Sequence, residues 1–85
     1  MDANAKKMIA YIQQLKTTII DKYEDEEYQI TTEWSGDLQV EKIAFKKPYD
    51  SQELENILPI IFERGANRAG KKFNILLSQF QDQLK

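Results

Sequence analysis

Residues 64–72 hold the side chains of this chain that are best suited to binding an anion. The segment reads RGANRAGKK and carries four cationic side chains and no acidic one. On a helix, Arg64, Arg68 and the pair Lys71 and Lys72 recur at intervals of three to four residues, which places them on one stripe. Such a stripe suits the oxygens of phosphate groups, so the spacing predicts phosphate contact.

Two other charged segments bear on this prediction. Lys46 and Lys47 form a second cationic spot, which we expect to extend the phosphate-binding surface. Residues 21–27 carry five acids and one base. The alternative to phosphate contact is therefore a solvated cationic face that pairs with Glu63 and with the acidic residues 24–27.

The small residues of the same segment predict close packing. A glycine inside a helix costs about 1 kcal/mol relative to alanine, and this segment holds two. On a helix, Gly65, Ala66, Ala69 and Gly70 form a patch beside the cationic stripe. We expect a strand or another helix to approach the backbone closely there.

The composition excludes several classes of site. The chain has no cysteine and no histidine, which removes disulfides, thiolate nucleophiles and the usual general base and zinc ligand. No constellation of the remaining groups stands out, so we expect a protein that is not an enzyme and holds no cofactor or metal. Length predicts one small domain, residues 1–85. No run reaches the roughly 18 apolar residues of a membrane span, and we expect a cytoplasmic location.

Three weaker candidates each have a simpler alternative. Residues 24–27 have enough carboxylates for a divalent cation, but they lack the alternating ligands and the glycine of a calcium loop, which favours a solvated turn. Glu33 and Glu41 could face each other across a hairpin, without the burial that tunes a catalytic pair. Tyr28 and Trp34 could stack on bases, although packing in a core or an interface explains them as well.

The first element predicted is a helix over residues 3–23, with Asp2 as its N-cap. The acidic residues 24–27 disfavour its continuation. Its apolar residues recur at alternating steps of four and three, a heptad seam suited to a partner helix. The seam contains Met8, Ile12, Leu15 and Ile19.

A β-hairpin is predicted next. Residues 28–34 alternate between two faces and are rich in aromatic and β-branched side chains, which indicates a strand. Residues 35–37 form a turn. A second strand over residues 38–47 changes phase midway, and a bulge near residues 41–42 would restore its apolar residues to one face.

The last element predicted is a long helix. Asp50 and Glu53 have the spacing of an N-cap and its capping box. Pro59 lies too deep for a helix that begins at Ser51, so we expect a short helical turn over 51–56, followed by a long helix to about residue 83. A single kinked helix is the alternative.

Together these elements predict an α+β fold with an N-terminal helix, an antiparallel hairpin or small sheet, and a long C-terminal helix. A small sheet is marginal alone, and the helices carry more apolar surface than one sheet absorbs, so we expect a symmetric homodimer. Pairing of the two helices within one chain is the competing solution. The dimer interface is predicted at Met8, Ile12, Leu15, Ile19, Gly65, Ala66, Ala69 and Phe73.

The chain resembles the YbaB/EbfC family of small bacterial nucleoid-associated proteins. Residues 36–45 match the glycine turn and second strand of that family. Asn67, Ala69, Lys71 and Lys72 match its Asn-x-Ala-x-basic-basic pattern in the last helix. The resemblance implies a homodimer in the bacterial nucleoid that binds double-stranded DNA with little sequence preference. The DNA-binding residues would be Arg64, Arg68, Lys71, Lys72, Lys46 and Lys47.

A second function stays open beside DNA binding. The acidic residues 21–27 and the helical seams could instead engage a protein partner, as in an interaction adaptor encoded by a phage or by an operon of unknown function. The net charge of −2 and the acidic lead-in to the hairpin favour this alternative.

Overall fold

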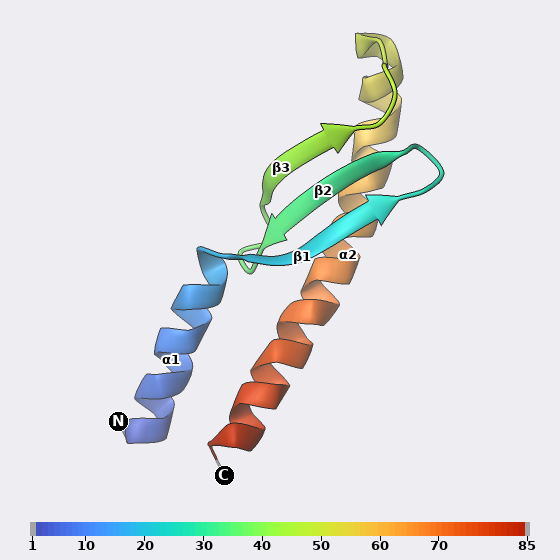
Figure 1. Cartoon of the computed structure of the whole chain (residues 1–85). Coiled ribbons are helices and arrows are strands. Elements are labelled where there is room, and N and C mark those ends of the chain that lie inside the picture. Colours follow the sequence, from blue (N-terminus) through green and yellow to red (C-terminus); the bar gives the residue numbers. More distant parts are fainter. Residues whose placement is uncertain (1, 85) are drawn as a thin grey trace.

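The structure, a computed structural model that describes residues 2–84, has the predicted α+β architecture (Figure 1). A helix is followed by a three-stranded sheet and a long second helix, which confirms the predicted fold class. The elements are α1 (Ala3–Lys16), β1 (Ile19–Asp25), β2 (Ile30–Ser35), β3 (Val40–Phe45) and α2 (Ser51–Gln83).

Helix α1 is shorter than predicted. Its N-cap is Asp2, whose carboxylate accepts a hydrogen bond from the Ala5 amide at 2.8 Å. It ends at Lys16 rather than near residue 23, and residues 19–25 form strand β1. The four residues 17–20 are all β-branched, and such residues favour a strand over a helix. The prediction of a helix over residues 17–23 is therefore wrong.

The sheet is an antiparallel meander in the order β1-β2-β3. The predicted bulge in the last strand is confirmed, because Glu33 pairs with Lys42 while the next residue, Trp34, pairs with Val40. This leaves Glu41 as the additional residue. Glu33 therefore faces Lys42 across the strands, and the proposed pair of carboxylates at residues 33 and 41 does not form.

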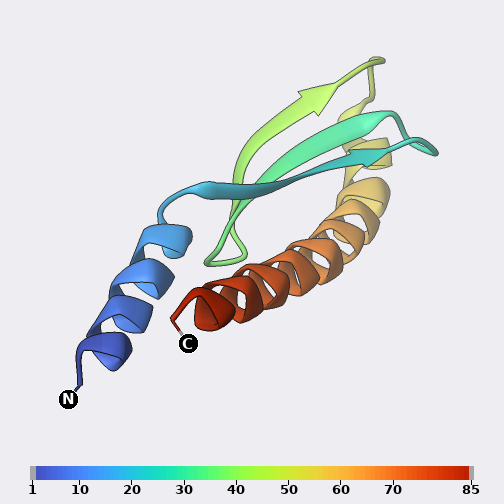
Figure 2. The ribbon, with the colours of Figure 1, turned by 60° about the horizontal axis from the view of Figure 1, so that its bottom comes forward.

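Helix α2 is one continuous helix of 33 residues with Pro59 inside it. The predicted N-cap is confirmed, since the Asp50 carboxylate accepts from the Glu53 amide at 2.8 Å. The separate helical turn over residues 51–56 is not present. Proline removes one backbone hydrogen bond without ending the helix, and Figure 2 shows α2 curving along its length.

Helix α2 covers one face of the sheet and lies mainly on β1 and β2. Strand β2 is central and most deeply buried. The buried apolar residues come from both layers and from the end of α1; they are Leu15, Ile30, Trp34, Ile61 and Ala69. This is a small core for a chain of 85 residues.

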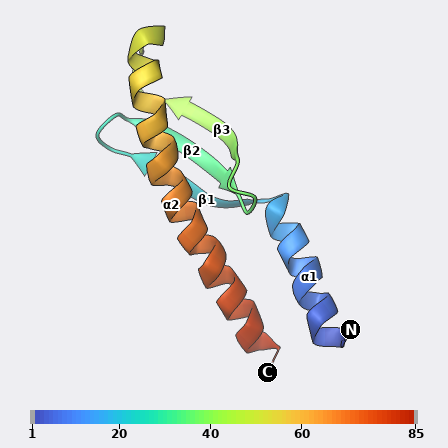
Figure 3. The ribbon, with the colours of Figure 1, turned by 180° about the vertical axis from the view of Figure 1, so that it is seen from behind.

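The C-terminal half of α2 runs past the sheet and lies beside α1 (Figure 3). The rings of Tyr11 and Phe80 stack there, with centroids 4.2 Å apart. The amide of Gly36, in the β2–β3 turn, donates to the Leu15 carbonyl at 2.8 Å and fixes the end of α1. We call this helix pair, residues 2–16 and 66–84, the arm, and residues 17–65 the head.

The molecule is elongated. Its radius of gyration is 15.8 Å and its extents are 53 × 18 × 17 Å, whereas a compact domain of this length has a radius of gyration of about 12 Å. The arm projects from the head and both chain ends lie at its tip (Figure 1). Much of the surface of the arm is therefore separate from the surface of the head.

Candidate nucleic-acid interface

The first arginine of the cationic stripe is held by acidic residues of the head. Arg64 Nη1 lies 2.9 Å from Asp25 Oδ2 and 3.0 Å from Glu27 Oε1. Its guanidinium also lies over the ring of Tyr28, 5.7 Å from the centroid. These carboxylates raise the pKa of the Arg64 guanidinium. Arg64 therefore connects α2 to the β1–β2 hairpin, as the alternative interpretation of the stripe expected.

Asp25 is the buried centre of this connection. Its side chain is 2% exposed and accepts hydrogen bonds from the Tyr23 hydroxyl at 2.6 Å and from the Tyr28 amide at 3.0 Å, besides the bond from Arg64. Burial opposes ionisation, but these three donors outweigh it and lower the pKa of Asp25. Burial and the bond to Asp25 raise the pKa of Tyr23. Asp25 thus stays ionised against its arginine.

The stripe changes character along its length. Arg68 Nε lies 3.1 Å from Asp21 Oδ2, whose side chain is 10% exposed, so Arg68 also binds β1. Lys71 and Lys72 are exposed and, within residues 2–84, form no ion pair. With Ile75 and the Arg68–Asp21 pair they line a shallow cavity of about 210 Å³. Of the stripe's four cations, only the two lysines are free to meet an external anion.

The small residues beside the stripe divide in the same way. Gly65 packs on the indole of Trp34, and a Cβ atom at Gly65 would lie 2.5 Å from its Nε1 atom. Ala69 is fully buried. A Cβ atom at Gly70 would meet nothing within 4 Å. The close approach predicted for this patch is therefore made by Trp34 of the same chain at Gly65, and it is absent at Gly70.

Lys46 and Lys47 lie at a different end of the molecule. They follow β3 and precede the start of α2, about 20 helical residues from Lys71, which corresponds to about 30 Å along the helix axis. Lys46 lines a cavity with Glu24, Asp25 and Glu26, and Lys47 lies over the Tyr49 ring. The structure does not bring these lysines together with Lys71 and Lys72.

The predicted dimer seam contributes mostly to the packing of the chain itself. Leu15 is buried, while Met8 and Ile12 are half-buried on α1. Ile19 belongs to β1 rather than to a helix. Ala66 and Phe73 of α2 are half-buried as well. Pairing of the two helices within one chain, the competing solution, is what the Tyr11–Phe80 stack shows.

The structure adds three cations that the sequence reasoning missed. Lys6, Lys7 and Lys16 belong to α1, whose residues 3–16 include no acid, and α1 lies beside the half of α2 that carries Lys71 and Lys72. The arm holds six basic and two acidic residues, and the head holds five basic and twelve acidic residues. The formal charges are therefore +4 on the arm and −7 on the head, which separates the charge in space.

Other kinds of site find no support in residues 2–84. This part of the chain contains no group of three or more acidic, histidine or cysteine side chains that could hold a metal ion. Neither helix is long and apolar enough to cross a membrane. Comparisons with protein-family models, with curated proteins and with solved structures gave no match. The resemblance to the YbaB/EbfC family therefore stays a prediction.

Proposed function

We propose that this chain is a non-enzymatic binding protein that works as a homodimer and holds double-stranded DNA along its arm, with little sequence preference. Its cytoplasmic or nucleoid location is part of the same proposal. Cations that are free to replace counterions on phosphates supply this kind of affinity. The proposal moves the contact away from Arg64 and the head lysines, and toward the arm.

The observation that carries the proposal is the separation of charge between arm and head. Lys71 and Lys72 are exposed and form no ion pair within residues 2–84, and the lysines of α1 lie on the same arm. The acidic head repels a polyanion, so DNA would meet the arm first. Two arms in a homodimer would double the number of contacts.

Fluorescence anisotropy with a labelled duplex at 50 mM salt tests the proposal. We expect binding that weakens steeply as salt increases, because counterion release drives it. Lys71→Glu with Lys72→Glu should weaken binding at least about tenfold. The matched control is Lys22→Glu with Lys42→Glu, two exposed lysines of the head, which should change binding much less. Equal losses from the two pairs, or no binding by the parent, would contradict the proposed surface.

The acidic head favours a second function, binding of a basic segment of another protein. Its net charge is −7, and Glu26 at the tip of the β1–β2 hairpin is exposed. Absence of a DNA complex at 50 mM salt, together with co-purification of a specific protein that Glu24→Lys with Glu26→Lys releases, would favour this adaptor over DNA binding.

A further inference from the structure

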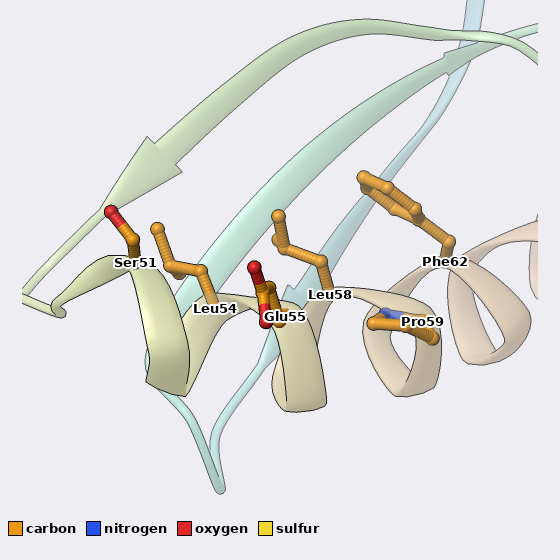
Figure 4. Close-up of a pocket in the computed structure, with 6 residues that line it drawn as sticks. All are labelled: Ser51, Leu54, Glu55, Leu58, Pro59 and Phe62. Atoms are coloured by element: carbon orange, nitrogen blue, oxygen red, sulfur yellow. The ribbon is translucent and has the colours of Figure 1, made fainter.

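An apolar groove remains open along the N-terminal half of α2. Figure 4 shows Leu54, Leu58 and Phe62 projecting from α2 on the side of the sheet. The cavity has a volume of about 470 Å³. Within residues 2–84 it is lined by Ser51, Leu54, Glu55, Leu58, Pro59 and Phe62.

The apolar side of β3 borders the same region. Val40 and Ile43 pair with Trp34 and Thr32 of β2, and residues directly opposite each other in a sheet share a face. They therefore lie on the face that α2 covers. Because α2 lies mainly on β1 and β2, this side of β3 is poorly covered, and Phe45 is 44% exposed.

The chain exposes more surface than a compact monomer of the same mass. The chain exposes 5950 Å², whereas a compact monomer of 10.0 kDa exposes about 5200 Å². The projecting arm contributes to this excess of about 700 Å² together with the groove and β3. A second copy of the chain that covers the groove and β3 would bury the part of this excess that lies on the head.

The charges around the groove suit a self-complementary contact. Residues 51–63 of α2 carry three acids and no base, while residues 46–49, which follow β3, carry two lysines and no acid. In a two-fold dimer each region of one copy can face the other region of its partner. The acidic side of one groove would then meet the basic side of the other.

We infer that the groove along residues 54–62 of α2, together with the apolar side of β3, is the contact surface for a second copy of this chain. This inference rests on the homodimer of the proposed function and gives that dimer an interface other than the predicted seam. Lys46 and Lys47 then serve the dimer contact rather than DNA. The two heads lie together and the two arms remain outside the interface.

Light scattering coupled to size-exclusion chromatography, with sedimentation equilibrium for affinity, tests the interface. The full chain should have a mass of roughly twice 10.0 kDa. Leu58→Glu places a charge in the groove and should raise the dimer Kd at least about 100-fold. Phe45→Ser removes an exposed ring with less risk to folding and should weaken the dimer in the same direction. Circular dichroism checks that each variant is folded.

Ile75→Glu is the matched control, because Ile75 is an apolar residue of the same helix that is 51% exposed on the arm. This variant should remain a dimer. A folded Leu58→Glu and Phe45→Ser that dimerise like the parent would overturn the groove as the interface and leave the homodimer standing. A monomeric parent would overturn both the interface and the homodimer. The exposed apolar groove would then be explained by the binding of a different protein. Fluorescence anisotropy with DNA measures DNA binding by the arm, and this result is independent of which surface forms the dimer.

Discussion

Two glycines of α2 lie in different environments, one in the head and one in the arm. Gly65 faces the head and lies against the Trp34 indole, while Gly70 is five residues further on and has open space where a side chain would start. The cations near each glycine share its environment. Arg64 and Arg68, on either side of Gly65, bind acids of β1. Lys71 and Lys72, next to Gly70, form no ion pair within the described residues. The comparison teaches that one continuous cationic segment first holds the fold together and then becomes an open surface.

The largest effect is expected on the head side, at Asp25. Asp25→Ala removes the acceptor that Tyr23, the Tyr28 amide and Arg64 share. Leaving these donors without a partner should lower the free energy of unfolding by about 3 kcal/mol. Urea denaturation measures it. The neighbouring Glu26→Ala, at an exposed residue, should change the same quantity by less than about 0.5 kcal/mol. Similar losses in the two variants would show that the hydrogen bonds of Asp25 do not stabilise the head more than an exposed carboxylate does.

The same carboxylate predicts an acid-dependent loss of stability. The pKa of Asp25 is lower in the folded chain than its ordinary value, so its contribution is present above about pH 4 and is lost as the pH falls through the folded pKa. Urea denaturation between pH 7 and pH 3 should show a loss in the parent that is smaller in Asp25→Asn. Parallel pH profiles for the two proteins would show that another group is responsible.

A smaller effect is expected at the second pair between helix and sheet. Arg68→Gln leaves the largely buried Asp21 carboxylate without its cation and should reduce the free energy of unfolding by about 1 kcal/mol, since the arginine itself is more than half exposed. The measurement is again urea denaturation. No change in Arg68→Gln would place Arg68 with the open lysines rather than with the head.

The smallest effect on stability is expected from the open lysines. Lys71→Gln with Lys72→Gln should change the free energy of unfolding by less than about 0.5 kcal/mol. The same double variant should reduce the salt dependence of DNA binding by about two ions per chain, because each lysine that is neutralised no longer displaces a counterion from a phosphate. A substantial loss of stability would mean that these lysines also hold the fold.

Local patterns in the sequence predict much of this fold. The N-caps at Asp2 and Asp50 and the bulge at Glu41 depend on neighbouring residues, and all three are present in the structure. Strand β1 was missed because Ile19 and Tyr23 fit a helical spacing as well as an alternating one. The run of β-branched residues from Thr17 to Ile20 was the signal for a strand.

The candidate site was less predictable because its partners are distant in the sequence. The helical spacing predicted close packing at the small residues of the segment 64–72, and the structure has it at Gly65 and Ala69 but not at Gly70. The pairing of Arg64 with Asp25 joins residues 39 apart, and it depends on the position of β1 across α2. The addition of Lys6, Lys7 and Lys16 to the arm depends on the packing of α1 against α2. Neither arrangement follows from any local pattern.

The most direct test of the division within residues 64–72 is to make the same substitution at both glycines and measure the free energy of unfolding by urea at one protein concentration. Gly65→Ala should lose about 2 kcal/mol, because its methyl group would overlap the Trp34 indole. Gly70→Ala should gain about 0.5–1 kcal/mol, because the methyl group meets nothing and alanine favours the helix. Opposite signs are the predicted result. Changes of the same sign and similar size would contradict the account, since they would mean that the two halves of the segment share one environment.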